Sequence, residues 1–428
     1  MKTIQSMSGK CGCLWMCLYV GQALCAQTVY QTEIYSSQVK SLELTVAGEL
    51  ISTPHIELNG AQRLEIDFDV LNHTQGRYAY TVIHCDADWK RSTLSPIEYM
   101  DGFQGMTVDD FAQAFNTTVH YTHFRLLLPN DYVRFRVSGN YALLVHEEDT
   151  PDKIAFSARF SVGEPLIDIQ AAVTGNTDIA FNRTCQQVSF RIDTKNLPVA
   201  YPRTDLKIRV NRNNRPDQEA VDLQPSSLSG NLLNYEHIPG LIFEAGNEYR
   251  RIEFLTHRYN GLNIERIRYF NPYYHADVAI DRSRSGQTYH YDQDQNGRFF
   301  IRCSNCQDPD VEADYFIVHF AYESKPFEDG DIYLLGDFLQ NRTDGNSRME
   351  YNTETGCYEK AVLLKQGYYN YQYVFLARGA TRGELLRTEG SYYQTENEYV
   401  ITVYYRPMGA RYDRIIGRTT VRNAQDVL

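Results

Sequence analysis

Tyrosine recurs at alternate positions in residues 365–406, and this spacing constrains the fold more than any other feature of the chain. Successive side chains of a β-strand point to opposite faces, whereas a helix would scatter the same positions around its axis. A tyrosine ring is apolar and its hydroxyl is polar, so a tyrosine-lined face is either a half-wet core or an adhesive surface. The candidates for an aromatic contact face are Tyr369, Tyr371, Tyr373, Tyr392 and Tyr393.

Short alternating segments separated by turn residues continue along the chain from residue 27 onward. Examples are Leu64–Leu71, Tyr78–Cys85 and Ala155–Val162. Strands that are short and regularly spaced are typical of β-sandwiches. The pattern predicts an all-β fold made of tandem immunoglobulin-like β-sandwich domains.

Two local segments carry more detailed expectations. The Gly139-Asn140 pair lies between two alternating runs and predicts a tight hairpin turn within residues 133–146. Residues 109–116 are the exception to the β pattern, because their spacing permits one short helix with Asp109 at its cap.

The length of the chain, 428 residues, exceeds the usual size of one hydrophobic core. Gly163, Glu164 and Pro165 interrupt the strand pattern before a new run begins. The predicted divisions are a signal peptide at 1–26, an N-terminal β-sandwich at 27–163, a middle β domain at 164–312 and a C-terminal β-sandwich at 313–428.

The first 26 residues have the layout of a signal peptide, with Lys2 and Lys10 before a short apolar run and small residues up to Ala26. The run is shorter than the roughly 20 residues of a spanning helix, and no later segment is comparably apolar. This predicts an exported chain with no spanning segment after cleavage. In an alternative reading Cys25 is a lipid-bearing first residue, although Leu24 stands where lipoprotein signals prefer Gly or Ala.

Charge and cysteine content limit the partners of the exported chain. The formal net charge of −12 argues against nucleic acid, which requires a basic face. Export places the remaining cysteines in an oxidising compartment, where they can pair. The Cys303–Cys306 spacing favours a small local disulfide or two plain thiols over zinc, because no second pair of ligands follows. The five cysteines are Cys85, Cys185, Cys303, Cys306 and Cys357.

Two polar segments resemble sites but have simpler explanations. Residues 84–89 (HCDADW) gather ligand-type side chains, yet no further ligands or catalytic partners can be named by spacing. Residues 292–297 (DQDQNG) open like a calcium loop, but Cys303 stands where Glu is needed, so a polar Asn-Gly hairpin turn is favoured. We therefore expect no catalytic residue, metal site, cofactor or small-molecule substrate. A hidden glycosidase carboxylate pair is kept as an alternative.

Several long motifs together resemble the plug protein family of the type IX secretion system. They are residues 78–103, 115–130, 137–145 and 246–250, together with the tyrosine block. The resemblance runs almost end to end. It implies an all-β, non-catalytic periplasmic subunit associated with the outer membrane. Such a subunit docks on the inner mouth of a large translocon β-barrel and closes it when no substrate is in transit.

The C-terminal unit also resembles early-set immunoglobulin-like domains of the glycogen-binding type, through residues 332–341 and 366–375. This resemblance gives a second functional hypothesis, a periplasmic or surface glycan-binding protein. Sugar-binding members present a tryptophan soon after the GDF element, whereas this chain has Leu339, Gln340 and Asn341 there. Trp89 is the single tryptophan left after export, which argues against a starch or glycogen platform.

Overall fold

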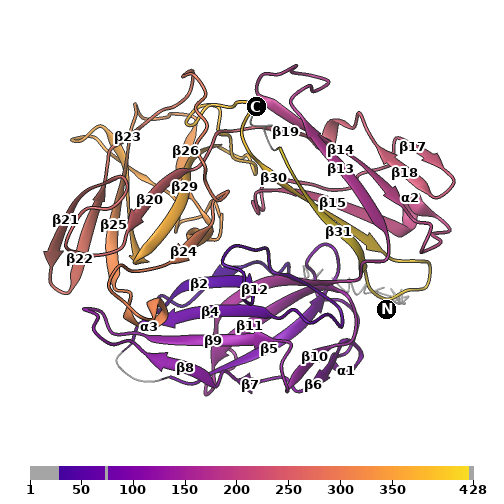
Figure 1. Cartoon of the computed structure of the whole chain (residues 1–428), viewed down its shortest axis with the longest axis horizontal. Coiled ribbons are helices and arrows are strands. Elements are labelled where there is room, and N and C mark those ends of the chain that lie inside the picture. The colour runs from indigo at the N-terminus through magenta and orange to yellow at the C-terminus, as the bar shows by residue number, and fades with distance from the viewer. Residues whose placement is uncertain (1–27, 73–75, 424–428) are drawn as a thin grey trace, which may run out of the picture.

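The computed structural model describes residues 28–72 and 76–423. The predicted signal peptide and Cys25 lie outside the described residues. Almost all regular structure is β, and the strands form three units, each with two main sheets around its own hydrophobic core; the first unit also has a two-stranded sheet of β10 and β6. Figure 1 shows the units arranged as a triangle, with the first at the bottom, the second at upper right and the third at upper left. The prediction of tandem β-sandwiches is confirmed.

The first unit packs a sheet of order β1-β12-β11-β5-β7, with β3 added beside β12, against a sheet of order β2-β4-β9-β8. Alternate apolar side chains of both sheets fill the core between them. Its elements are β1 Glu33–Ile34, β2 Val39–Val46, β3 His55–Glu57, β4 Leu64–Val70, β5 Tyr78–Cys85, α1 Pro96–Tyr99, β6 Met100–Gly102, β7 Met106–Thr107, β8 Asp110–Gln113, β9 Thr122–Leu128, β10 Val133–Phe135, β11 Gly139–Glu147 and β12 Ile154–Gly163.

The second unit packs a sheet of order β13-β14-β18-β17, with β19 beside β14, against a sheet of order β16-β15-β30-β31. Its elements are β13 Asp168–Thr174, β14 Cys185–Asp193, α2 Pro202–Asp205, β15 Leu206–Arg212, β16 Glu219–Ala220, β17 Ser227–Ser229, β18 Leu232–Tyr235, η1 Pro239–Leu241, β19 Ile242–Glu244, β30 Glu398–Tyr405 and β31 Arg414–Arg422.

The third unit packs a sheet of order β20-β29-β24, with β26 beside β29, against a sheet of order β21-β22-β25-β28-β27, with β23 beside β25. Its elements are β20 Arg250–Phe254, β21 Ile264–Phe270, β22 Tyr273–Val278, β23 Asp281–Arg282, β24 Phe299–Ile301, α3 Pro309–Glu312, β25 Tyr315–Glu323, β26 Gly330–Leu335, η2 Asp337–Leu339, β27 Glu350–Asn352, β28 Cys357–Lys365 and β29 Gly367–Ala377.

The strands do not divide at the expected boundary between residues 312 and 313. Residues 250–301 pair within the third unit, whereas β30 and β31, yellow in Figure 1, return to the second unit, where β30 pairs with β15. Alternation identifies a strand but not its partner, because every strand of a sandwich has the same period. The middle and C-terminal segments are thus interleaved.

Two local predictions are wrong. Residues Asp110–Gln113 form strand β8, not a helix, and all four side chains are exposed. Backbone pairing with β9 determines this conformation, which outweighs a weak helical spacing. Gly139 and Asn140 begin β11 instead of forming a hairpin turn, since β10 pairs with β6 and β11 pairs with β5 and β12.

Buried polar contacts join each unit to the other two. Between the first and third units, Lys365 Nζ lies 2.7 Å from the Asp69 carboxylate, and both side chains are buried. Between the first and second, the Asp413 carboxylate accepts a hydrogen bond from the Ala87 amide at 2.9 Å. A further buried ion pair, between Arg298 and Glu398, links the third unit to β30. These contacts hold the triangle together.

Candidate functional site

The tyrosines of β29 lie in the core and not on a contact face. Tyr369, Tyr371 and Tyr373 are each at most 1% exposed and pack within the core of the third unit. The opposite face of β29 is also covered, since Asn370 and Gln372 are buried. The expectation of an exposed aromatic surface is therefore not met for these three residues, because β29 is a central strand with neighbours on both edges and both faces.

Tyrosine suits these positions because a carboxylate lies within reach of the buried hydroxyls. The Tyr371 and Tyr373 hydroxyls donate to Asp281 at 2.8 and 2.9 Å. Burial raises the pKa of both phenols well above the usual value, so both remain donors. The alternating tyrosines of β29 thus form part of a hydrogen-bonded core and do not form a binding surface.

Tyr392 and Tyr393 lie half-buried in the loop between β29 and β30, where the second and third units meet. The Tyr392 hydroxyl donates to the Gln287 carbonyl at 2.7 Å, and the Tyr393 ring lies directly against Gly175. A Cβ at Gly175 would approach the ring to 2.4 Å. Both rings therefore pack against their own chain, and whether they contact a partner remains a prediction.

The polar segment at residues 84–89 is a structural corner. His84 is fully buried, its Nδ1 lies 2.9 Å from the Ser92 hydroxyl, and burial lowers its pKa to about 4, so it is neutral. Asp88 pairs with Arg209 of the second unit. Trp89 stacks under the Arg159 guanidinium, 4.5 Å from ring centroid to Cζ. His84, Asp88 and Trp89 therefore already have partners within the chain.

The carboxylates of residues 292–297 also have partners within the chain. Asp292 pairs with Arg251, and Asp294 accepts from the backbone amides of Tyr249 and Asn296. Burial raises the pKa of Asp294 to about 7. Asn296 and Gly297 both have positive φ, as the predicted polar turn requires, but they turn into β24 without forming a hairpin.

Cys303 and Cys306 form a disulfide, one of the two states expected for this spacing. Cys85, Cys185 and Cys357 are free thiols. Within residues 28–72 and 76–423, no group of three or more His, Cys, Asp or Glu side chains has a metal-binding arrangement. No helix in the same part of the chain is long and apolar enough to cross a membrane.

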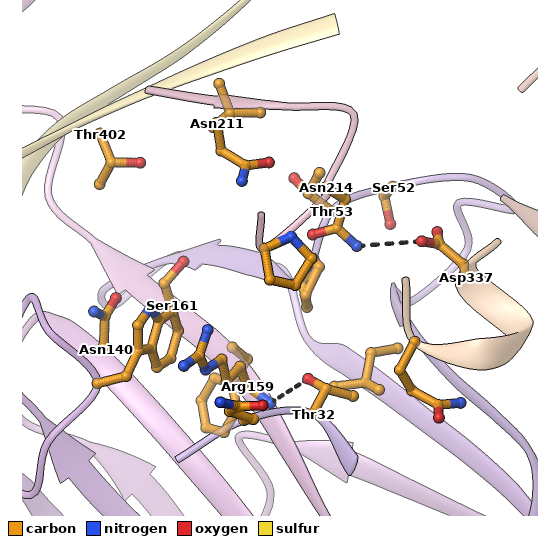
Figure 2. A pocket seen from close by; sticks show the side chains of 18 of the residues that line it. Thr32, Ser52, Thr53, Asn140, Arg159, Ser161, Asn211, Asn214, Asp337 and Thr402 are labelled. Atoms are coloured by element: carbon orange, nitrogen blue, oxygen red, sulfur yellow. Dashed lines mark hydrogen bonds between the residues drawn. The ribbon is translucent and has the colours of Figure 1, made fainter. Parts of the chain in front are cut away.

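A cavity of about 450 Å³ lies where the three units meet, and each unit contributes to its wall. The first unit supplies β12 and the segment before β3, the second supplies β15, β30 and β31, and the third supplies η2 and the turn before β24. Figure 2 shows hydroxyl and amide side chains around it, with Thr402 and Asn211 above and Arg159 and Thr32 below.

Five arginines line this cavity, and only some of them have carboxylate partners. Arg209 contacts Asp88 and Glu219, Arg298 pairs with Glu398, and Arg342 pairs with Glu33 and Asp344. Among the described residues, no carboxylate lies within ion-pair distance of the two that remain. These are Arg159 and Arg418.

Burial shifts the pKa values of the cavity wall toward neutral forms. It lowers the pKa of Arg159 and of Arg418 to about 10, which still leaves both charged at pH 7. It also raises the pKa of Glu43 to about 8, with the nearby Asp67 carboxylate adding to the effect. Burial similarly raises the pKa of Asp337 to about 6. At pH 7 the wall thus keeps its positive charges and loses most of the Glu43 charge.

Sequence reasoning missed this cavity because its arginines lie far apart along the chain. Arg209 and Arg418 are separated by about half its length, yet Arg209 pairs with Thr402 and Thr402 with Arg418 across three adjacent strands. The one available signal was an arginine on the more polar face of β12 and of β31, which reads equally well as a solvated face.

Comparison with known proteins identifies the family. Residues 39–164 match the model of the type 9 secretion system plug protein first domain, a range that coincides with the first unit. The first unit therefore belongs to the plug protein family of the type 9 secretion system. A plug-family assignment was predicted from the sequence motifs and is confirmed. The matched family is a secretion plug domain and is not a known enzyme family.

The fold is also similar to a solved structure. The crystal structure of a hypothetical protein from Parabacteroides merdae superposes with a TM-score of 0.92 and 57% sequence identity, over 92% of this chain and 100% of that one. No curated protein matches the chain. The arrangement of the three units in this plug-family chain therefore recurs in a second protein.

Proposed function

We propose that the chain is a non-catalytic periplasmic plug that docks on the inner mouth of the outer-membrane type IX translocon barrel and closes it when no substrate is in transit. The observation that carries this proposal is the family match at residues 39–164, which covers nearly all of the first unit. Three sandwiches joined by buried ion pairs support it further, since a wide pore is sealed by a body that covers area without deforming.

Docking of this kind must be reversible. A moderate interface with a polar rim releases more readily than a large hydrophobic one. The net charge of −12 and the scattered exposed apolar side chains of the described surface fit a contact of that kind better than an obligate one.

The deciding measurement is outer-membrane permeability. In a strain that keeps the barrel but lacks this chain, we expect entry of a solute of vancomycin size, and re-expression of the chain should restore the barrier. A strain lacking both proteins is the control and should stay sealed. Unchanged permeability in the barrel-containing deletion strain would refute the plug proposal.

The docking surface can be sought by co-purification with the barrel. One corner of the first unit exposes apolar side chains around α1, β6 and β10, where the Phe103 amide donates to the Tyr132 carbonyl. Phe103 is 73% exposed and Tyr132 is 51% exposed. We expect Phe103→Ser with Tyr132→Ser to lower barrel recovery, whereas a matched pair on the second unit, Ile179→Ser with Phe181→Ser, should not. The reverse result would place docking on the second unit.

A further inference from the structure

The cavity between the three units contains charge that the protein itself does not neutralise. The Arg418 guanidinium donates no hydrogen bond to any described residue, and the Arg159 Nε donates to the Tyr30 carbonyl at 2.6 Å, which leaves its terminal nitrogens available. Both side chains are half-buried, so their charges face the cavity and are available to an anion. Both arginines line the same cavity, one from the first unit and one from the second.

The arrangement of these arginines is fixed by their neighbours. Three residues are paired across adjacent strands: Arg209 of β15 pairs with Thr402 of β30, and Thr402 pairs with Arg418 of β31. In the first unit, the Trp89 ring lies against the Arg159 guanidinium and limits its orientation. A guanidinium presents a planar set of donors that matches a carboxylate or a phosphate in two-point contacts. The wall is therefore organised to receive an anion.

The remaining wall indicates what else the ligand carries. Thr53 and Thr402 make no side-chain hydrogen bond with described residues, and the Asn214 amide reaches Asp337 only at 3.5 Å. Free hydroxyl and amide groups suit a ligand with several hydroxyls, because each can donate and accept. The volume of about 450 Å³ lies within the range of small-molecule sites.

We propose that this central cavity binds a small anionic sugar, whose carboxylate or phosphate group contacts Arg159 and Arg418 and whose hydroxyls contact the polar side chains of the wall. The sugar would contact all three units at once, so its binding stabilises their arrangement. The proposal does not depend on the plug function, since it concerns a site within the isolated chain.

Calorimetric titration and thermal unfolding of the purified protein test this proposal. The probes are glucuronate and glucose 1-phosphate, with neutral glucose and inorganic phosphate as comparisons. We expect an anionic sugar to bind with a Kd near 1 mM or tighter and to raise Tm, and glucose to do neither. Lack of binding by both anionic sugars at about tenfold that concentration overturns the proposal. Equal binding of inorganic phosphate and glucose 1-phosphate overturns its sugar component.

Arg418→Met separates binding from folding. It keeps the aliphatic stem and removes an unpaired charge, so the ligand-free variant should have a Tm equal to or above that of the natural protein. The same variant should lose at least about tenfold in affinity, as should Arg159→Met. Arg136→Met, which removes an exposed arginine of the first unit, is the matched control and should bind normally. A lower Tm with unchanged affinity for Arg418→Met would show that the residue is merely structural.

Discussion

Single hydroxyl groups explain why the core of the third unit uses tyrosine. Tyr373→Phe keeps the ring but removes one of two phenol donors to Asp281, whose carboxylate also pairs with Arg250 at 2.6 Å. Loss of a hydrogen bond to this half-buried carboxylate costs about 1–2 kcal/mol, so the free energy of unfolding should fall by that amount in denaturant titrations. Tyr393→Phe is the control, because its hydroxyl has no partner among the described residues, and it should be neutral. Equal losses for both variants would contradict this role.

Glu43 makes stability depend on pH in a defined direction. Burial, together with the Asp67 carboxylate, raises its pKa in the folded state from about 4.5 to about 8. The folded state then holds the proton more tightly than the unfolded state, so this contribution to stability is present at low pH and is lost as pH rises toward 8 and beyond. Lys365, Asp310 and Asp69 are the other charged groups near it.

Glu43→Gln should remove this dependence. We expect the stability of the variant relative to the natural protein to increase as pH rises. The difference in unfolding free energy should grow by about 1–3 kcal/mol between pH 5.5 and pH 9. Chemical denaturation at a series of pH values measures the difference directly. A gap that stays constant over this range would mean that the carboxyl ionises normally in the folded protein.

At the level of elements, the interleaving of strands decides which pieces of chain can fold. The fragment 164–312 lacks β30, so one edge of β15 has no partner strand and the core loses Tyr399, Ile401 and Val403. We expect this fragment to aggregate and to show no cooperative unfolding. By contrast, residues 164–246 joined by a short glycine linker to residues 396–423 should fold, because the Asn397 side chain already donates to the Ala245 carbonyl at 2.7 Å. Circular dichroism on heating distinguishes the two outcomes.

Most individual strands could be predicted from the sequence, but their partners and the cavity could not. The alternation at Tyr369, Tyr371 and Tyr373 marks β29 correctly because side-chain period is a local property. Whether that face is exposed depends on distant residues that pack against it. Here Phe316 and Phe320 of β25, on the facing sheet, lie in the same core as the tyrosines. In the same way, nothing local to Arg418 shows that it lines the same cavity as Arg159, since the two come from different units.

At the scale of the whole molecule, the buried contacts between units predict that the chain unfolds as one cooperative body. Asp413 is fully buried, and its carboxylate accepts from the Ala87 amide at 2.9 Å and from Lys207 at 3.0 Å, which ties β31 and its loop to the first unit. A single calorimetric transition, with equal calorimetric and van't Hoff enthalpies, is the expected result for the natural protein.

Asp413→Ala should break that cooperativity. It leaves the buried Ala87 amide without an acceptor and Lys207 without its partner, at a cost of about 2–3 kcal/mol concentrated at one junction. We expect a second transition at lower temperature, or a calorimetric enthalpy that exceeds the van't Hoff value. Asp101→Ala, which removes an exposed ion pair with Arg136, should leave a single transition. If Asp413→Ala merely lowers the temperature of one sharp transition, the junction is not where the units separate, and the three units behave as one undivided body.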